Sequence, residues 1–297
     1  MSSIRTFKIF LAVAKHGTFA AAGAEIGLTA AAVGMQIRSL EEDLHLTLFD
    51  RSARAVVLNT SGRNLVPKID DLVQRYESLG ATDENEVCGS VVVGSLVSAL
   101  MGAFADALWK VKRDHPRLEV RLLAGLSARF TDMVEDGELD AAVITRPPRT
   151  LSSNLLWTPL YTEPMVLIVP RRPHFEMPEN AIDILTHAPF LRFDRHTWTG
   201  YLVQAAIEQC GVEVNDEMEL NSVETILAIV RQGFGVAIVP KLANVRWSDD
   251  SELRAINIPG VDIRREVGLL ERKNHSRQRV TAAIKQFFES GTEKSDH

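Results

Sequence analysis

The sequence has few cysteines, few aromatic residues and no long apolar run. Its two cysteines, Cys88 and Cys210, lie far apart in 297 residues and form no CxxC pair, which is typical of a reducing cytoplasm. No window offers roughly 20 consecutive apolar residues and no signal-peptide pattern opens the chain, so we expect a cytoplasmic protein without a membrane span. With 45% hydrophobic residues, the chain is long enough for about two domains whose cores need neither disulfides nor metals.

Signatures of catalysis are also missing. The eight histidines show no HExxH or HxH spacing, and the sequence contains no GxSxG elbow and no Walker loop. Gly233-Phe234-Gly235 is better explained by a helix end and a tight turn than by a nucleotide-binding loop. We therefore expect no enzyme activity, no catalytic residue, no metal and no cofactor, and a disulfide switch between Cys88 and Cys210 is disfavoured.

The formal charge of −6 argues, by itself, against binding to nucleic acid. The charge is unevenly distributed, however, because residues 1–68 carry eight Lys/Arg against five Asp/Glu, or +3, and the remainder carries −9. A phosphate backbone responds to local charge, so a basic N-terminal module on an acidic body is compatible with DNA binding. Chance asymmetry explains a difference of this size equally well.

The first 45 residues predict three short helices. Apolar residues at helical spacing indicate a helix over 4–16 that ends at Gly17, after which Thr18 caps a second helix and Thr29 caps a third. Two short helices joined by a tight turn with glycine are typical of a helix-turn-helix, whose second helix presents its outward residues to the major groove. The buried stripe of the third helix consists of Val33, Ile37, Leu40 and Leu44.

The outward face of the third helix and the segment after it carry the predicted DNA contacts. Arg38 suits guanine or phosphate, and the amide of Gln36 suits adenine. Residues 50–55 are polar and basic and precede a short strand, so we interpret them as a wing that contacts phosphate. The predicted DNA-binding residues are Thr18, Thr29, Ala30, Ala31, Gly34, Met35, Gln36, Arg38, Arg51 and Arg54.

Three further runs are specific to one family: Gln36-Ile37-Arg38-x-Leu40-Glu41, Leu48-Phe49-x-Arg51 and Leu58-x-Thr60-x-x-Gly62. Through them the segment resembles the N-terminal domain of the LysR-type transcriptional regulators. The family usually has Gln at the position of Ala30, Pro or Ser at Ala31 and Ser at Gly34. The resemblance therefore implies DNA binding with fewer base-reading donors, so contacts with thymine methyl groups and shape readout must contribute more.

A connecting helix of about 20 residues is predicted from Thr60 onward, followed by a polar hinge over 80–86. Its apolar residues follow a heptad-like spacing, and such a seam is buried either by its own domain or by a partner. We expect a partner, because the small N-terminal module offers little surface, and in the family this helix joins two DNA-binding domains into a dimer. The seam consists of Leu65, Ile69, Leu72, Tyr76 and Leu79.

From Gly89 onward, strands alternate with helices. Strands over 90–95, 118–123 and 141–144 are separated by a helix from Ala99 to about Asp114 and by another over 129–135, and this order predicts a parallel sheet. A second cluster of strands and helices, including a strand over 165–169, is followed by a last strand over 266–270 and a helix over about 276–289.

Matching runs in this half are Asp136-Gly137-x-Leu139-Asp140, Ser222-x-Glu224 and Gly233-x-Gly235-x-x-Ile238-x-Pro240. Through them this half resembles the effector-binding half of the same regulators, which is similar to periplasmic solute-binding proteins with two lobes around a cleft. The expected fold is therefore α/β, with a winged helix-turn-helix, a long linker helix and a two-lobed periplasmic-binding-protein-like domain. The expected boundaries are 1–59 for the DNA-binding domain, 60–86 for the linker and hinge, and 87–297 for the effector-binding domain. Lobe I is expected to span about 87–160 and 266–297, and lobe II about 161–265.

Parallel sheets bind ligands at the carboxyl ends of their strands, and hydroxyls near helix N-termini suit a small carboxylate. Arg146 offers a bidentate partner for the carboxylate, and His196 and Trp198 offer a hydrogen bond and a flat wall. Ser98 and Ser127 are explained equally well as helix caps, and Arg146 as an exposed loop cation. The predicted effector-binding residues are Leu96, Ser98, Ser127, Arg146, His196, Thr197, Trp198 and Ser222.

The sequence thus predicts a ligand-responsive transcriptional regulator. Its expected partners are double-stranded operator DNA, a small-molecule effector, a second copy in a homodimer or homotetramer, and RNA polymerase, without any membrane. The alternative is a small-solute-binding protein whose N-terminal helices serve assembly only, and it predicts no affinity for duplex DNA above the nonspecific level.

Overall fold

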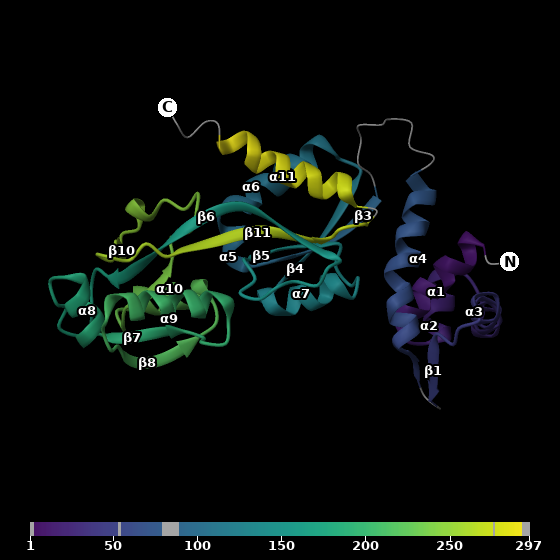
Figure 1. Cartoon of the computed structure of the whole chain (residues 1–297), viewed down its shortest axis with the longest axis horizontal. Coiled ribbons are helices and arrows are strands. Elements are labelled where there is room, and N and C mark those ends of the chain that lie inside the picture. Colours follow the sequence, from purple (N-terminus) through teal and green to yellow (C-terminus); the bar gives the residue numbers. More distant parts are fainter. Residues whose placement is uncertain (1–2, 53–54, 79–88, 276, 293–297) are drawn as a thin grey trace.

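The computed structural model describes residues 3–52, 55–78, 89–275 and 277–292. These residues form three parts, which we call the head (3–58), the linker helix α4 (Thr60–Ser78) and the body (89–292). Figure 1 shows α4 standing between the head and the body, with its long axis across that of the molecule.

The head contains the three helices predicted from the sequence, and each begins at a side-chain cap. Ser3, Thr18 and Thr29 accept hydrogen bonds from backbone N–H groups of the first turns. The first two helices end at Gly17 and Gly27, whose φ values of 67° and 70° lie in the left-handed region that glycine adopts without strain. The elements are α1 (Ile4–His16), α2 (Phe19–Ile26), α3 (Ala30–Leu44) and the antiparallel wing strands β1 (Phe49–Ser52) and β2 (Ala55–Leu58).

The linker helix packs partly against its own head, which corrects one expectation. Ile69 is buried in the head core, and Leu65 packs against that core, so this part of the predicted seam is covered without a partner. Leu72 and Tyr76 remain 44% and 56% exposed. The seam splits because α1 also lies along α4, a contact that heptad spacing alone does not reveal. Leu79 lies outside the described residues.

Lobe I is built on the parallel strands that the sequence predicts. β3 pairs in parallel with β4 on one side and with β5 on the other. The expected single helix after β3 is instead two helices, because the chain breaks at Gly102, where an added Cβ would meet the carbonyl oxygen of Ala243 at 2.8 Å. The elements are β3 (Gly89–Ser95), α5 (Val97–Met101), α6 (Ala103–Asp114), β4 (Leu118–Ala124), α7 (Ser127–Glu135) and β5 (Ala141–Thr145).

Two long antiparallel strands, β6 and β11, connect the lobes. β11 pairs with β5 and with the first part of β6, and the second part of β6 pairs with β9 and β10 of lobe II. The sequence predicts only the apolar second part of β6 as a strand, because the first part contains polar residues and Pro159. The elements are β6 (Leu155–Pro170), α8 (Ala181–His187), β7 (Pro189–Phe193), α9 (Trp198–Cys210), β8 (Asn215–Leu220), α10 (Val223–Arg231), β9 (Ala237–Pro240), a 3-10 turn (Trp247–Asp249), β10 (Leu253–Ile256), β11 (Arg264–Arg272) and α11 (Gln278–Thr292).

None of the helices in the described part of the chain is, taken singly, both long and apolar enough to cross a membrane. Taken together, α2 and α3 reach the length and composition of a span, but they are bent by 101° at the break between them.

Candidate DNA-binding and effector-binding sites

A cleft of about 310 Å³ lies where lobe I meets lobe II. Four helices begin at it, and each follows the carboxyl end of a parallel strand: α5 after β3, α7 after β4, α9 after β7 and α10 after β8. First-turn residues of all four helices line the same space, and the N-terminal end of a helix favours a ligand that presents oxygen acceptors. A cavity of this size is large enough for a small organic molecule.

Seven of the eight predicted effector-binding residues line this cleft. Arg146 does not, because its guanidinium pairs with Glu266 at 2.7 Å and lies over the Trp157 ring, while the side chain is largely exposed. The alternative explanation of Arg146 as an exposed loop cation therefore fits the structure. The lining residues that were predicted are Leu96, Ser98, Ser127, His196, Thr197, Trp198 and Ser222.

Neither Ser98 nor Ser127 caps a helix, although capping was the competing explanation for both. The N-cap residues of α5 and α7 are Leu96 and Leu126, and no side chain caps either helix. Both serine side chains are buried and accept one hydrogen bond each: Ser98 from Arg265 at 3.1 Å and Ser127 from the backbone N–H of Thr145 at 3.2 Å. The two caps at the cleft are in lobe II, where Thr197 begins α9 and Ser222 begins α10.

A buried ion pair that the sequence does not predict lies at the cleft, where Arg265 is one of the lining residues. Arg265 on β11 and Glu163 on β6 face each other in the antiparallel register and are 1% and 0% exposed. Two guanidinium nitrogens of Arg265 donate to Glu163, Nε at 2.8 Å, and the other carboxylate oxygen accepts from the backbone of Ala243. The charge of Arg265 is therefore compensated within the protein, where the lobe-connecting strands meet. The sequence signal was weak, since Arg264-Arg265 precedes a strand without any motif.

Glu224 is the second cleft residue that the sequence analysis missed. It belongs to the first turn of α10, and one carboxylate oxygen accepts a hydrogen bond from the hydroxyl of Ser222 at 2.5 Å. The other oxygen is buried without a hydrogen-bond partner in the described part of the chain. The Ser222-x-Glu224 run is part of the family resemblance, but nothing in the sequence around Glu224 indicates its place in the cleft.

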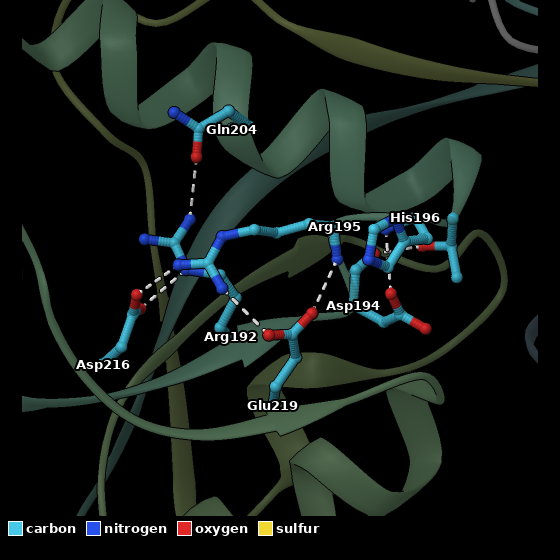
Figure 2. Close-up of polar contacts among 8 residues, drawn as sticks. Arg192, Asp194, Arg195, His196, Gln204, Asp216 and Glu219 are labelled. Atoms are coloured by element: carbon cyan, nitrogen blue, oxygen red, sulfur yellow. Dashed lines mark hydrogen bonds and ion pairs between the residues drawn. The ribbon is translucent and has the colours of Figure 1, made fainter.

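A network of ion pairs fixes the loop that carries the lobe II wall of the cleft. Figure 2 shows Arg192 and Arg195 converging on Asp216, with Arg195 also pairing with Glu219 at 2.9 Å. The carboxylate of Asp194 then accepts from the backbone N–H of His196 at 2.8 Å. These contacts tie residues 194–197 to β8, so the predicted lining residues of this loop have a defined position.

Several DNA-binding candidates are exposed on the head. Ala30, Ala31 and Arg38 are exposed on α3, and Met35 is 67% exposed on the same helix. Gly34 is partly covered by the Phe19 ring. Thr18 and Thr29 are exposed at the starts of α2 and α3, where their hydroxyls cap these helices.

The remaining candidates are Gln36, Arg51 and Arg54. The amide oxygen of Gln36 accepts from the Thr6 hydroxyl at 3.1 Å, which leaves its second lone pair and its N–H groups for a contact with adenine. Arg51 belongs to the wing strand β1, opposite Val56, while Arg54 lies outside the described residues.

The described residues hold no cluster of three or more His, Cys, Asp or Glu side chains arranged for a metal ion. Burial raises the pKa of the Cys210 thiol above its usual value, which disfavours the reactive thiolate. Cys88, the other half of the disfavoured disulfide, lies outside the described residues.

Two family models match this chain, one over the head and the start of the linker helix and one over the body. The family model described as "Bacterial regulatory helix-turn-helix protein, lysR family" matches residues 4–63, and the model described as "LysR substrate binding domain" matches residues 84–292. A probable RuBisCO transcriptional regulator of Cyanophora paradoxa is 27% identical over 287 residues, covering 92% of this chain and 86% of its own. A probable nitrogen assimilation transcriptional activator of Synechococcus elongatus is 26% identical, covering 82% of this chain and 80% of its own.

Solved structures show the same fold at lower identity. A full-length OxyR variant from Pseudomonas aeruginosa matches with a TM-score of 0.74 and 18% identity, covering 97% of this chain and 95% of its own. Full-length CbnR in complex with its target DNA matches with a TM-score of 0.56 and 18% identity, covering 96% of this chain and 99% of its own. The relatives are regulators and not enzymes or solute carriers, so the solute-binding alternative is not favoured. The chain belongs to the LysR family of transcriptional regulators and carries the family's effector-binding domain.

Proposed function

We propose that the head binds operator DNA in the cytoplasm as a homodimer, that two dimers form a homotetramer, and that RNA polymerase is its further partner. The exposed face of α3 supports the DNA contact, with Arg38 as its cation. Leu72 and Tyr76, two exposed apolar side chains spaced four residues apart on α4, support pairing through this helix. A head with few base-reading donors gains affinity when two heads are joined, since the second contact becomes intramolecular.

We further propose that a small carboxylate-bearing effector occupies the cleft and changes the position of α4. The observation that carries this proposal is the course of α7. This helix begins in the cleft at Ser127 and ends at the loop of Gly137, where an added Cβ would meet Pro67 of α4 at 2.5 Å. Nine residues of helix span about 13 Å, so α7 is a short rigid rod between the effector and the linker helix. Figure 1 shows α7 on the side of the body that faces α4.

Charged groups surround the C-terminal end of α7, where it approaches the linker helix. Arg272 donates to the carbonyl oxygens of Val134 and Leu139, which close the C-terminal end of α7. Burial lowers the pKa of Arg272, and the negative charges of Asp140 on the body and of Asp70 and Asp71 on α4 oppose this shift. The guanidinium thus lies between the end of α7 and the acidic face of the linker helix. An effector that moves the start of α7 changes the contact between Arg272 and α4. This requires the effector to bind one position of α7 more tightly than the other.

The DNA-binding half is tested by titrating the intact chain with duplex fragments at several salt concentrations. If Arg38 meets phosphate, Arg38→Ala weakens binding and lowers the salt slope by about one. Arg195→Ala, a loss of the same charge from the body, is the matched control and leaves the slope unchanged. Equal slopes for Arg38→Ala and the native chain would contradict the proposed contact.

The coupling half is tested with the double variant Asp70→Asn/Asp71→Asn. It removes the α4 charges near Arg272 and leaves the cleft and α3 intact. We expect an unchanged effector dissociation constant and an unchanged effector-free DNA affinity, with a smaller effect of effector on DNA binding. A full effector response in this variant would contradict a route through α7 and Arg272.

A further inference from the structure

The chemical class of the effector follows from the hydrogen-bonding state of the two walls of the cleft. We propose that the effector is an α-amino acid with an apolar side chain, whose ammonium group pairs with Glu224 and whose carboxylate meets Ser98 and Ser127. This inference rests on the proposed effector role of the cleft, and it goes beyond it by requiring a positively charged group on the ligand.

The charge balance of the cleft requires that positive group. The charged side chains among the lining residues are Glu224 and Arg265, and His196 is the further ionisable one. Glu163 compensates Arg265 behind the cleft wall, whereas no ion pair with Glu224 occurs between residues that the structure describes. A ligand that carries only negative charge would therefore meet an uncompensated carboxylate, which opposes its binding.

Glu224 also has an unused acceptor. Its Oε2 accepts from Ser222, but Oε1 is covered by protein atoms without receiving a hydrogen bond from the described residues. Buried polar atoms are normally paired, so an orphan at the edge of a ligand cleft points to a missing donor. An ammonium group supplies three donors and a compensating charge to this acceptor.

The lobe I wall has the opposite character. The hydroxyl oxygens of Ser98 and Ser127 accept from Arg265 and from the Thr145 backbone, and neither hydroxyl donates a hydrogen bond to another residue that the structure describes. Ser127 also begins α7, a nine-residue helix without a side-chain cap, whose first-turn N–H groups add further donors. Donors on this wall and an acceptor on the lobe II wall match the two ends of a zwitterion.

The rest of the lining is apolar and limits the size of the ligand. The apolar residues of the lining include Leu96, Val97, Phe193, Trp198 and Val223. A volume of about 310 Å³ holds an amino acid of the size of valine, leucine or phenylalanine. An apolar side chain loses contact with water there without leaving a polar group unpaired.

The test compares ligands that differ in one group, added to the full chain. The probes are the twenty proteinogenic L-amino acids, with leucine set against 4-methyl-2-oxopentanoate and 3-methylbutylamine, and phenylalanine set against phenylpyruvate and 2-phenylethylamine. Binding is measured by calorimetry and by tryptophan emission, since Trp198 lines the cleft. We expect at least one apolar amino acid to bind, and its 2-oxo acid and its amine to bind at least tenfold more weakly.

Variants identify the group responsible. We expect Glu224→Gln to weaken the amino acid at least tenfold and to make the 2-oxo acid bind more tightly, because the amide keeps the shape but removes the negative charge that opposes an anionic ligand. Ser127→Ala weakens both compounds. Glu213→Gln, at an exposed glutamate outside the cleft, is the matched control and changes neither.

Each outcome decides the inference. Binding of the 2-oxo acid as tightly as the amino acid, an unchanged affinity in Glu224→Gln, or no binding by any of the twenty amino acids overturns it. Duplex binding of the same preparation separates this result from the proposed function. A protein that binds DNA but prefers 2-oxo acids refutes only the amino-acid class, whereas a protein that fails to bind DNA refutes the proposed function itself.

Discussion

The buried pair of Arg265 and Glu163 gives the most exacting prediction for stability. Glu163→Gln preserves the shape of the side chain but leaves a guanidinium that is 1% exposed without a counter-ion. Breaking a buried ion pair by removing one partner costs about 3–5 kcal/mol, because the remaining charge stays desolvated. Among the described residues, the other hydrogen bond of Arg265 goes to the neutral hydroxyl of Ser98, which does not replace the lost negative charge. We expect Glu163→Gln to lower the free energy of unfolding of the body by this amount.

The four tryptophans make the measurement specific to the body. Trp109, Trp157, Trp198 and Trp247 all lie after the linker, so tryptophan emission during urea unfolding reports the body and not the head. The matched control is Glu266→Gln, which breaks the exposed pair with Arg146 and is expected to cost at most about 1 kcal/mol.

A double-mutant cycle isolates the interaction from the loss of either side chain. Arg265→Met alone leaves Glu163 buried without its counter-ion, whereas Glu163→Gln/Arg265→Met removes both charges. We expect the double variant to be more stable than the sum of the single losses implies, by more than about 1 kcal/mol. Additive losses, or a cost for Glu163→Gln no larger than that of Glu266→Gln, would refute the reasoning.

Three further predictions concern the acid response, the recognition helix and the linker. Burial raises the pKa of Glu271, but hydrogen bonds from His275, Lys285 and Thr281 outweigh it and hold the pKa at about 2, below the usual 4.5. Stability from this carboxylate is therefore complete above pH 4.5, and up to about 3 kcal/mol is lost as the pH falls from 4.5 to 2. Urea unfolding at pH 5 and pH 3 measures the part of this loss that falls above pH 3, about 2 kcal/mol. Lys285→Met should reduce it, and an equal loss in this variant would contradict the assignment. Gly34→Ala should stabilise the head by up to about 1 kcal/mol, because alanine favours the helix and an added Cβ would meet only the Phe19 ring at 3.6 Å. Hydrogen exchange of the α3 amides checks this prediction, and faster exchange in the variant would contradict it. Tyr76→Glu should weaken self-association in sedimentation without lowering the melting temperature of the head, and an unchanged association constant would exclude this face of α4 from the dimer contact.

The helices of the head and the parallel strands of lobe I can be predicted from the sequence, because local signals determine where these elements begin and end. Thr18, Thr29 and the left-handed Gly17 and Gly27 mark the helix boundaries through capping chemistry that acts within four residues. The order of strands and helices after Gly89 likewise predicts the parallel pairing of β3 with its neighbours.

The cleft was predicted less completely, because its remaining residues depend on contacts far along the chain. Glu163 and Arg265 are about a hundred positions apart and meet only when β6 and β11 pair, so no local pattern reveals that Arg265 is neutralised. Arg146 was predicted to line the cleft because it follows the end of β5. Its side chain instead contacts Glu266 and Trp157, outside the cleft. The split seam of α4 arises in the same manner from packing against α1.

The central claim is that occupancy of the cleft changes how the heads contact DNA. The most direct measurement is a nuclease footprint of the full chain on duplex fragments selected by the chain itself, with and without the amino acid that binds most tightly. The account predicts that the protected region changes in length or spacing when the ligand is added, and that Asp70→Asn/Asp71→Asn binds the ligand but keeps the ligand-free footprint. Identical footprints for the native chain with and without bound ligand would contradict it.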